Sequence, residues 1–206
     1  MTDRYLWDSF LNGNPQAYED IYSQFYQNLY SYGVRKTNRP DLVRDCIQDL
    51  FVHLWTNRAN LGQTDNIKYY LLASLRNFLI KASVNNGKWQ GVALDANAPF
   101  QMEFNPEMTL LLKEREGQRS KMIVQALEQL TDRQKEAIYL RYFEELSYEE
   151  VAELMNISVK GTYKLVYRAL EVLKSVLNIP KSDIIILLMT CRLEFFSSLK
   201  HFLNQH

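Results

Sequence analysis

The sequence predicts an all-α protein with two small helical domains joined by a linker, the second of them a helix-turn-helix. The 206 residues include only 7 Gly and 5 Pro, which disfavours disorder and loop-rich β folds. Hydrophobic residues make up 47% of the chain and recur at spacings of three and four, as they do on one face of a helix. Residues 83–105 lack this periodicity and are expected to form the linker.

Three helices are expected in the first domain, residues 3–82. The second of them has the clearest amphipathic pattern, which comprises Val43, Cys46, Ile47, Leu50, Phe51, Leu54 and Trp55. The expected boundaries are Asn14-Pro15 and Gly33 for the first helix, Pro40 for the start of the second, and Asp65 and Ala82 for the third.

The second domain, residues 106–177, contains the most informative local signals. Two capping boxes mark two helix starts sixteen residues apart. After the second start, Asn156 suits a left-handed turn residue, and a further capping residue follows at once. Two helices joined by so short a turn predict a helix-turn-helix. The expected helix starts are Pro106, after Asn105, and the capping residues Thr131, Ser147 and Ser158.

The helix after Ser158 has two chemically distinct faces. One face carries Lys160, Lys164 and Arg168, which are spaced four residues apart. A basic helix fits the DNA major groove, where its early residues reach base edges and its cations reach phosphates. We therefore predict that this segment is a DNA recognition helix. The opposite face is expected to pack inward through Thr162, Leu165, Val166, Ala169, Leu173 and Val176.

The overall charge hides this local polarity. The 24 basic and 24 acidic residues cancel to a formal net charge of zero, which argues against a protein that simply coats nucleic acid. Basic residues nevertheless dominate from Ser158 to Lys174, whereas the segment just before it is acidic. The acidic residues in that segment are Glu144, Glu145, Glu149, Glu150 and Glu153.

Catalytic and metal-binding functions find little support. No glycine-rich phosphate loop and no recognisable catalytic serine, cysteine or carboxylate occurs, so an enzyme is not expected. Cys46 and His53 are two candidate ligands on one helix, which is too few for a metal site, and no cofactor is expected. With only Cys46 and Cys191, no disulfide framework is indicated, and a reducing cytoplasm is the simplest setting.

No membrane segment or secretion signal is expected from the sequence. The longest apolar run, residues 184–189, is far shorter than the roughly 20 residues that a membrane-spanning helix needs. It belongs to an apolar tail, residues 178–206. Burying each large apolar side chain is worth about 1.5–3 kcal/mol, so the tail must fold back or meet a partner.

Three segments resemble those of one protein family. Residues 127–173, which contain LTDRQKEAIYLRYFEELSYEEVAELMNIS, resemble the DNA-binding region four of bacterial extracytoplasmic-function (ECF) sigma factors. DLVRDCIQDLFVHLW at 41–55 and IKYYLLASLRNFLIK at 67–81 resemble their region two. The resemblance implies a promoter-specificity subunit that binds core RNA polymerase, recognises promoter DNA and initiates transcription. An anti-sigma factor, which many relatives have, is a further implied partner.

The resemblance also implies three sets of site residues. The duplex minus-thirty-five element would be contacted by Ser158, Val159, Lys160, Thr162, Tyr163, Lys164, Tyr167 and Arg168. The minus-ten element and its melted non-template strand would be held by Asn66, Lys68, Tyr69, Tyr70, Arg76, Asn77 and Lys81. The polymerase clamp coiled coil would be bound by Asp45, Gln48, Asp49, Phe51, His53 and Trp55.

Core packing competes with these roles at the apolar positions. For Phe51 it is the favoured interpretation, because Phe51 lies on the apolar stripe of its helix. Tyr69 and Tyr70 are adjacent, so only one of them can face the core, and the other is free to stack on an unpaired base.

Two other functions remain open at this point. A helix-turn-helix regulator that uses its first domain for dimerisation or sensing would bind an operator without polymerase, with two-fold symmetry. A helical protein-binding adaptor would show no salt-dependent affinity for DNA.

Overall fold

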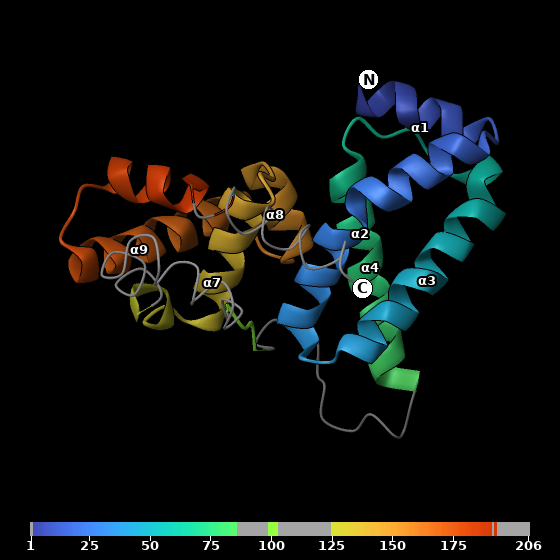
Figure 1. Ribbon diagram of the computed structural model, residues 1–206. Helices are drawn as coiled ribbons and strands as arrows, with labels where there is room; N and C mark the ends of the chain where they lie inside the picture. The colour runs from blue at the N-terminus through green and yellow to red at the C-terminus, as the bar shows by residue number, and fades with distance from the viewer. Residues whose placement is uncertain (1, 86–98, 103–124, 191, 193–206) are drawn as a thin grey trace, which may run out of the picture. The chain divides into compact units, whose positions relative to one another are not determined.

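In the computed structural model the chain is helical, and no strand occurs among the residues it describes, which are 2–85, 99–102, 125–190 and 192 (Figure 1). The predicted all-α class is confirmed. The chain divides into two compact units, Met1–Ala98 and Pro99–His206.

Unit 1 is a bundle in which α2, α3 and α4 all pack against one another, while α1 contacts α2, α4 and η1. Its core lies between these helices and contains the fully buried side chains Ile21, Leu29, Val43, Leu50, Leu71 and Leu75. The elements are α1 (Asp3–Leu11), α2 (Pro15–Thr37), α3 (Pro40–Asn57), η1 (Arg58–Asn60) and α4 (Ile67–Asn85).

The first helix, α1, was not among the helices that the periodicity predicts, and it is held by tertiary contacts. Trp7 is fully buried, and its indole Nε1 donates a hydrogen bond to the carbonyl oxygen of Gly62 at 3.0 Å. The ring of Trp7 lies 5.0 Å, centroid to centroid, from that of Phe10 and equally far from that of Tyr70. The carboxylate of Asp3 accepts the backbone N–H of Ile67 at 3.1 Å, so α1 also stabilises the start of α4.

Two predicted helix boundaries in unit 1 are wrong. Helix α2 ends at Thr37, where Asn38 adopts the left-handed conformation with φ of 54° and donates its N–H to Val34 at 2.7 Å. Helix α4 begins at Ile67, and its cap is Asn66, whose Oδ1 accepts the N–H of Tyr69 at 3.0 Å.

Gly33 lies inside α2, next to Val43 of α3. A Cβ atom built on Gly33 would lie 2.6 Å from Cγ1 of Val43, closer than two carbon atoms can approach. The glycine is therefore required by helix packing rather than by a helix end.

Unit 2 contains the predicted helix-turn-helix. Both capping boxes are present, at Thr131 and Ser147, and the Ser158 hydroxyl oxygen accepts the N–H of Gly161 at 3.1 Å. Asn156 has φ of 52°, as predicted for the turn. The elements are a helical turn at 125–128, α7 (Asp132–Ile138), the π-helical turn η3 (Tyr139–Phe143), α8 (Tyr148–Leu154) and α9 (Val159–Leu177).

The predicted linker, residues 83–105, is too long at both ends. Helix α4 continues through Asn85, and Phe100 is fully buried in unit 2 with its ring centroid 5.5 Å from that of Tyr139. The expected helix start at Asn105-Pro106 lies outside the described residues.

The apolar tail folds back on the rest of unit 2 at residues 181–190 and 192. Residues 181–190 form a helix, drawn in red beside α9 in Figure 1, and Ile184 and Leu188 are buried. Lys181 forms an ion pair with Glu171 of α9, and Arg192 forms one with Glu145. Charged and apolar side chains at 181, 184, 188 and 192 thus share one stripe of helical spacing.

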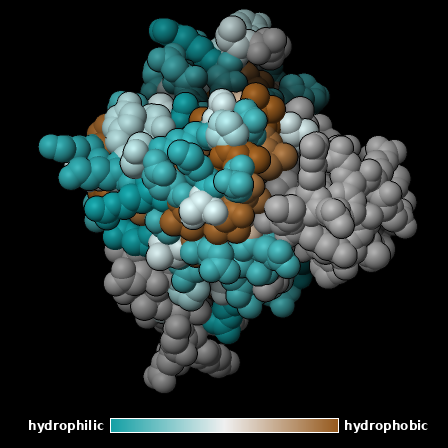
Figure 2. Space-filling view, turned by 90° about the vertical axis from the view of Figure 1, so that its left-hand side faces the viewer, coloured by the Kyte–Doolittle hydropathy of each residue, from teal (hydrophilic) through white to brown (hydrophobic). Residues whose placement is uncertain are grey.

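The opposite side of this tail helix stays in contact with water. Ile186 is 63% exposed and Met189 is 47% exposed. Figure 2 shows a band of hydrophobic side chains among hydrophilic ones on the side of the molecule where Figure 1 places α9. Only one face of the tail helix is therefore used for folding of unit 2.

Replacing Gly33 by Ala should destabilise unit 1. Overpacking costs about 1–3 kcal/mol, which exceeds the gain of about 0.5–1 kcal/mol from a better helix former. Urea denaturation followed by tryptophan fluorescence, to which Trp7 and Trp55 of unit 1 contribute, measures the change. Gly62→Ala is the matched control, because an added Cβ meets nothing within 4 Å there. A Gly33→Ala protein as stable as the original would contradict the packing argument.

The tail helix should contribute to the stability of unit 2 through its buried side. Ile184→Ala is expected to cost about 2–5 kcal/mol, whereas Ile186→Ala should be nearly neutral because that side chain is exposed. Hydrogen exchange of amides in α7, α8 and α9 reports the difference. Equal effects of the two substitutions would show that the tail helix does not dock as described.

Candidate nucleic-acid interface

Helix α9 separates an apolar face from a basic one. The buried side chains are Thr162, Val166, Ala169, Leu170, Leu173 and Leu177. Lys160, Lys164 and Arg168 are exposed, and none of them takes part in an ion pair with the part of the chain that the structure describes. Val176, predicted to pack inward, is instead 41% exposed near the end of the helix.

Three of the five acidic residues that precede α9 are bonded within unit 2, whereas Glu149 and Glu153 are exposed. Glu144 is fully buried and accepts the hydroxyl hydrogen of Tyr139 at 2.6 Å. Glu145 pairs with Arg192, and Glu150 accepts the backbone N–H of Ser147 at 2.7 Å in the capping box. These internal bonds leave the cations of α9 as a positive surface.

The structure removes Thr162 from the predicted DNA contacts. Its side chain is fully buried, and its hydroxyl donates to the carbonyl oxygen of Ser158 at 3.3 Å. Tyr163 and Tyr167 are 50% and 59% exposed, so their rings are accessible beside the basic residues. Ser158 and Val159 are exposed at the start of the helix.

The two adjacent tyrosines of α4 point to different surroundings. The ring of Tyr70 contacts that of Trp7 at an angle of 58°, and burial raises the pKa of the Tyr70 hydroxyl. Tyr70 therefore takes part in the packing between α1 and α4, although its side chain is half-buried like that of Tyr69. Tyr69 is half-buried and remains the candidate of the pair.

The other residues predicted on α4 lie along its whole length rather than in one cluster. Asn66 caps the helix through its side-chain oxygen. Asn77 and Lys81 are exposed, and the Lys81 ammonium lies 5.9 Å from the centre of the Phe78 ring. Lys68 and Arg76 are half-buried.

Helix α3 presents a polar face to solvent. The predicted residues Asp45, Gln48, Asp49 and His53 are exposed there. Val52, which the sequence analysis did not single out, lies among them and is 55% exposed. Val52 could have been identified from the sequence, because it is an apolar residue that lies outside the buried stripe of this helix.

Phe51 and Trp55 mostly serve the core of unit 1. Phe51 is only 2% exposed and contacts the rings of Tyr18 and Tyr22, so a direct contact with a partner is excluded in this structure. Trp55 is half-buried, and the guanidinium of Arg58 lies 4.4 Å from the centre of its ring.

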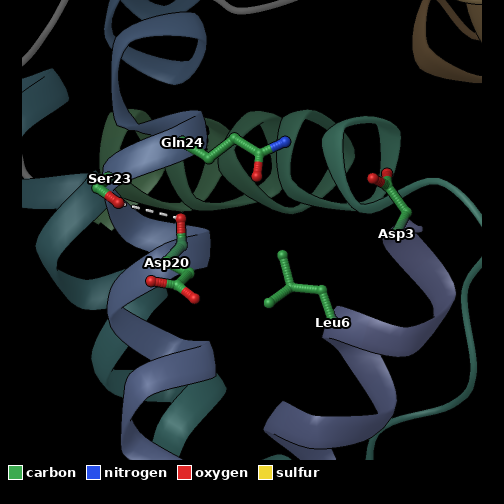
Figure 3. A pocket seen from close by; sticks show the side chains of 5 residues that line it. All are labelled: Asp3, Leu6, Asp20, Ser23 and Gln24. Carbon is green, nitrogen blue, oxygen red and sulfur yellow. Dashed lines mark hydrogen bonds between the residues drawn. The ribbon is translucent and has the colours of Figure 1, made fainter. Parts of the chain in front are cut away.

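A shallow hollow of about 370 Å³ lies between α1 and α2 and is a poor site for an anion. Figure 3 shows Asp3 and Leu6 on its α1 side and Asp20, Ser23 and Gln24 on its α2 side. The Ser23 hydroxyl is engaged with the backbone carbonyl oxygens of Glu19 at 2.9 Å and Asp20 at 3.1 Å. With two carboxylates and no basic side chain in its lining, this hollow repels phosphates.

The described residues offer neither a cluster of metal ligands nor a membrane-spanning helix. They hold no group of three or more His, Cys, Asp or Glu side chains placed to bind a metal ion. None of their helices is long and apolar enough to cross a membrane.

The helix-turn-helix of unit 2 belongs to a known class of DNA-binding domain. Residues 120–173 match the family model described as sigma-70, region 4. The match covers the capped helix pair and most of α9.

Relatives match most of the chain. The RNA polymerase sigma factor YlaC of Bacillus subtilis is 28% identical over 164 residues, which cover 80% of this chain and 92% of the relative. The ECF RNA polymerase sigma factor SigM of the same organism is 24% identical over 162 residues, or 78% of this chain and 94% of the relative.

Solved structures show the same fold. The sigma factor RpoE of Bartonella quintana, in complex with the anti-sigma factor NepR, superposes with a TM-score of 0.53 at 20% identity, covering 78% of this chain and 96% of that one. CnrH in complex with the cytosolic domain of CnrY has a TM-score of 0.52 at 18% identity, covering 85% and 97%. The region 4 match and the two relatives make the chain similar to the ECF sigma factors over most of its length.

Cys46, beneath the exposed face of α3, should be chemically inert in the folded protein. Burial, followed by the carboxylates of Asp49 and Asp45, raises the pKa of its thiol to about 11, so the reactive thiolate is scarce at neutral pH. A Cys191→Ser variant treated with a thiol-specific disulfide reagent at pH 8 should react slowly when native and rapidly in denaturant. The native rate should rise only as the pH approaches about 11. Fast native reaction at pH 8 would contradict this burial.

Proposed function

We propose that this sigma factor binds core RNA polymerase through α3 of unit 1 and the minus-thirty-five promoter element through α9 of unit 2. The observation that carries the proposal is the exposed row Lys160, Lys164 and Arg168 on a capped helix-turn-helix. Such a helix can enter the major groove, with its cations directed at phosphates and its first residues at base edges.

The polymerase contact is assigned to the polar face of α3. Asp45, Gln48, Asp49 and His53 surround the exposed Val52. An apolar side chain within a polar rim is the usual composition of a protein-binding site. Trp55 lies at the edge of this surface, and Phe51 supports it from below.

The minus-ten element is assigned to α4. Tyr69 supplies an aromatic face for an unpaired base of the non-template strand, and Asn77 and Lys81 supply an amide and a cation at the exposed surface. Lys68 and Arg76 complete this set. Tyr70 is left out because it packs on Trp7.

The same proposal covers partners, chemistry and location. The chain acts in the cytoplasm, catalyses no reaction itself, and leaves RNA synthesis to the polymerase. An anti-sigma factor is included as a regulator, because a solved relative of the same fold is bound to one. A helix-turn-helix regulator with an unrelated first domain is less well supported, because the sigma factor relatives match 78–80% of this chain and hence both units.

Two double substitutions should separate the two binding activities. Lys164→Ala with Arg168→Ala should weaken binding to promoter DNA and lower the slope of log affinity against log salt by about two units, one for each phosphate contact. Binding to core polymerase should be unchanged. Titrations of a labelled promoter duplex at several salt concentrations measure the first effect, and Lys174→Ala, at the far end of α9, is the matched control.

Gln48→Ala with Asp49→Ala should give the opposite result. Affinity for core polymerase is expected to fall by about fivefold or more, as for interface residues that cost above 1 kcal/mol, while DNA binding is retained. Transcription from a library of genomic fragments, with and without the full chain, identifies the promoters. If either pair of substitutions reduced both activities equally, the division of labour would be wrong. If no new start sites appeared with the chain, its proposed function would be wrong.

A further inference from the structure

Two tyrosines from different helices stack on each other at the surface of unit 2. The ring centroids of Tyr148 in α8 and Tyr163 in α9 are 3.9 Å apart, and their planes differ by only 19°. Tyr163 remains 50% exposed. The stack therefore joins the two helices of the helix-turn-helix and still leaves part of one ring accessible.

Tyr148 is itself held from the protein side. The guanidinium carbon of Arg141 lies 4.9 Å from the centre of the Tyr148 ring, and its Nη1 donates to the carbonyl oxygen of Leu146 at 2.8 Å. Burial, the neighbouring Tyr148 and a hydrogen bond with it raise the pKa of Tyr142 to about 12, against the opposing effect of Arg141. Tyr148 is thus a supported platform rather than a freely rotating surface side chain.

Tyr163 lies on α9 at the edge of the basic face. It follows Lys160 by three residues, precedes Lys164 by one and precedes Tyr167 by four, and all of these residues are exposed. On a helix, residues three and four apart are neighbours. If Lys160 and the cations that follow it bind phosphates, the ring beside them is within reach of the base edges of the groove.

An exposed tyrosine usually samples several rotamers, and fixing one of them upon binding costs conformational entropy. Stacking on Tyr148 restricts the Tyr163 ring before DNA arrives. The ring can then contribute its contact without that cost. In the major groove, the apolar feature that distinguishes one base is the C5-methyl group of thymine.

Resting on the proposed function, we propose that Tyr148 is a positioning residue that holds the Tyr163 ring against the methyl group of a thymine in the minus-thirty-five element. Tyr163 makes the DNA contact, and Tyr148 acts through it. This pair provides sequence preference, whereas Lys160, Lys164 and Arg168 provide affinity for phosphates.

The test replaces thymines by uracils, which lack only the methyl group. A promoter identified by transcription with core polymerase is prepared as a duplex in which each thymine of the minus-thirty-five element is replaced in turn. For the full-length chain, one of these replacements should weaken binding about fourfold, the effect expected for removing one methyl-sized apolar contact. Tyr163→Ala should bind the thymine and uracil duplexes equally.

Variants of the platform then separate positioning from a general role in folding. Tyr148→Phe retains the stacked ring and should keep the methyl preference, whereas Tyr148→Leu should reduce it to about twofold or less. Tyr163→Phe should also keep the preference, because the contact needs the ring and not the hydroxyl. Circular dichroism checks that each variant is folded. If Tyr148→Leu does not fold, Tyr163→Ala, which changes an exposed side chain, tests the methyl contact instead.

The outcomes distinguish this inference from the proposed function. If the chain directs transcription but no uracil replacement weakens binding, or if Tyr148→Leu retains the full methyl preference, the inference is wrong and the proposed function stands. If the chain neither binds a promoter nor directs transcription, both are wrong.

Discussion

The structure of unit 2 depends on how α9 is held at its turn, because this one helix must bury an apolar face and keep a cationic face in water. The turn is defined by Asn156 in the left-handed conformation, by the N–H of Ile157, which donates to Ala152 at 2.9 Å, and by the Ser158 cap. These local bonds fix the direction in which α9 leaves α8. Burial of Thr162 and Val166 then decides the rotation of the helix about its axis.

A chain without net charge can present a positive surface only if some of its carboxylates are bonded elsewhere in the protein. Glu144, Glu145 and Glu150 are bound to Tyr139, to Arg192 and to a helix cap, respectively. A carboxylate engaged in this way stabilises the fold. The chain can therefore be neutral overall and still present one helix face of a single sign.

Much of the fold and part of the site could be predicted from the sequence. The capping boxes at Thr131 and Ser147 were predictable because each satisfies the first N–H groups of a helix with residues three positions apart. The exposure of Lys160, Lys164 and Arg168 follows from helical spacing in the same way. Contacts between distant segments could not be predicted, such as the Trp7 bond to Gly62 that holds α1.

The sequence by itself determined the helical class, the helix-turn-helix and the two faces of α9. These features depend on capping hydrogen bonds and on a period of 3.6 residues, which involve only residues close together in the chain. Only the tertiary structure decided which of two adjacent tyrosines contacts Trp7, that Gly33 serves helix packing, and that Phe100 and the tail helix belong to unit 2. These outcomes depend on which surfaces meet in space. Composition and spacing define the surfaces of each helix but not their partners.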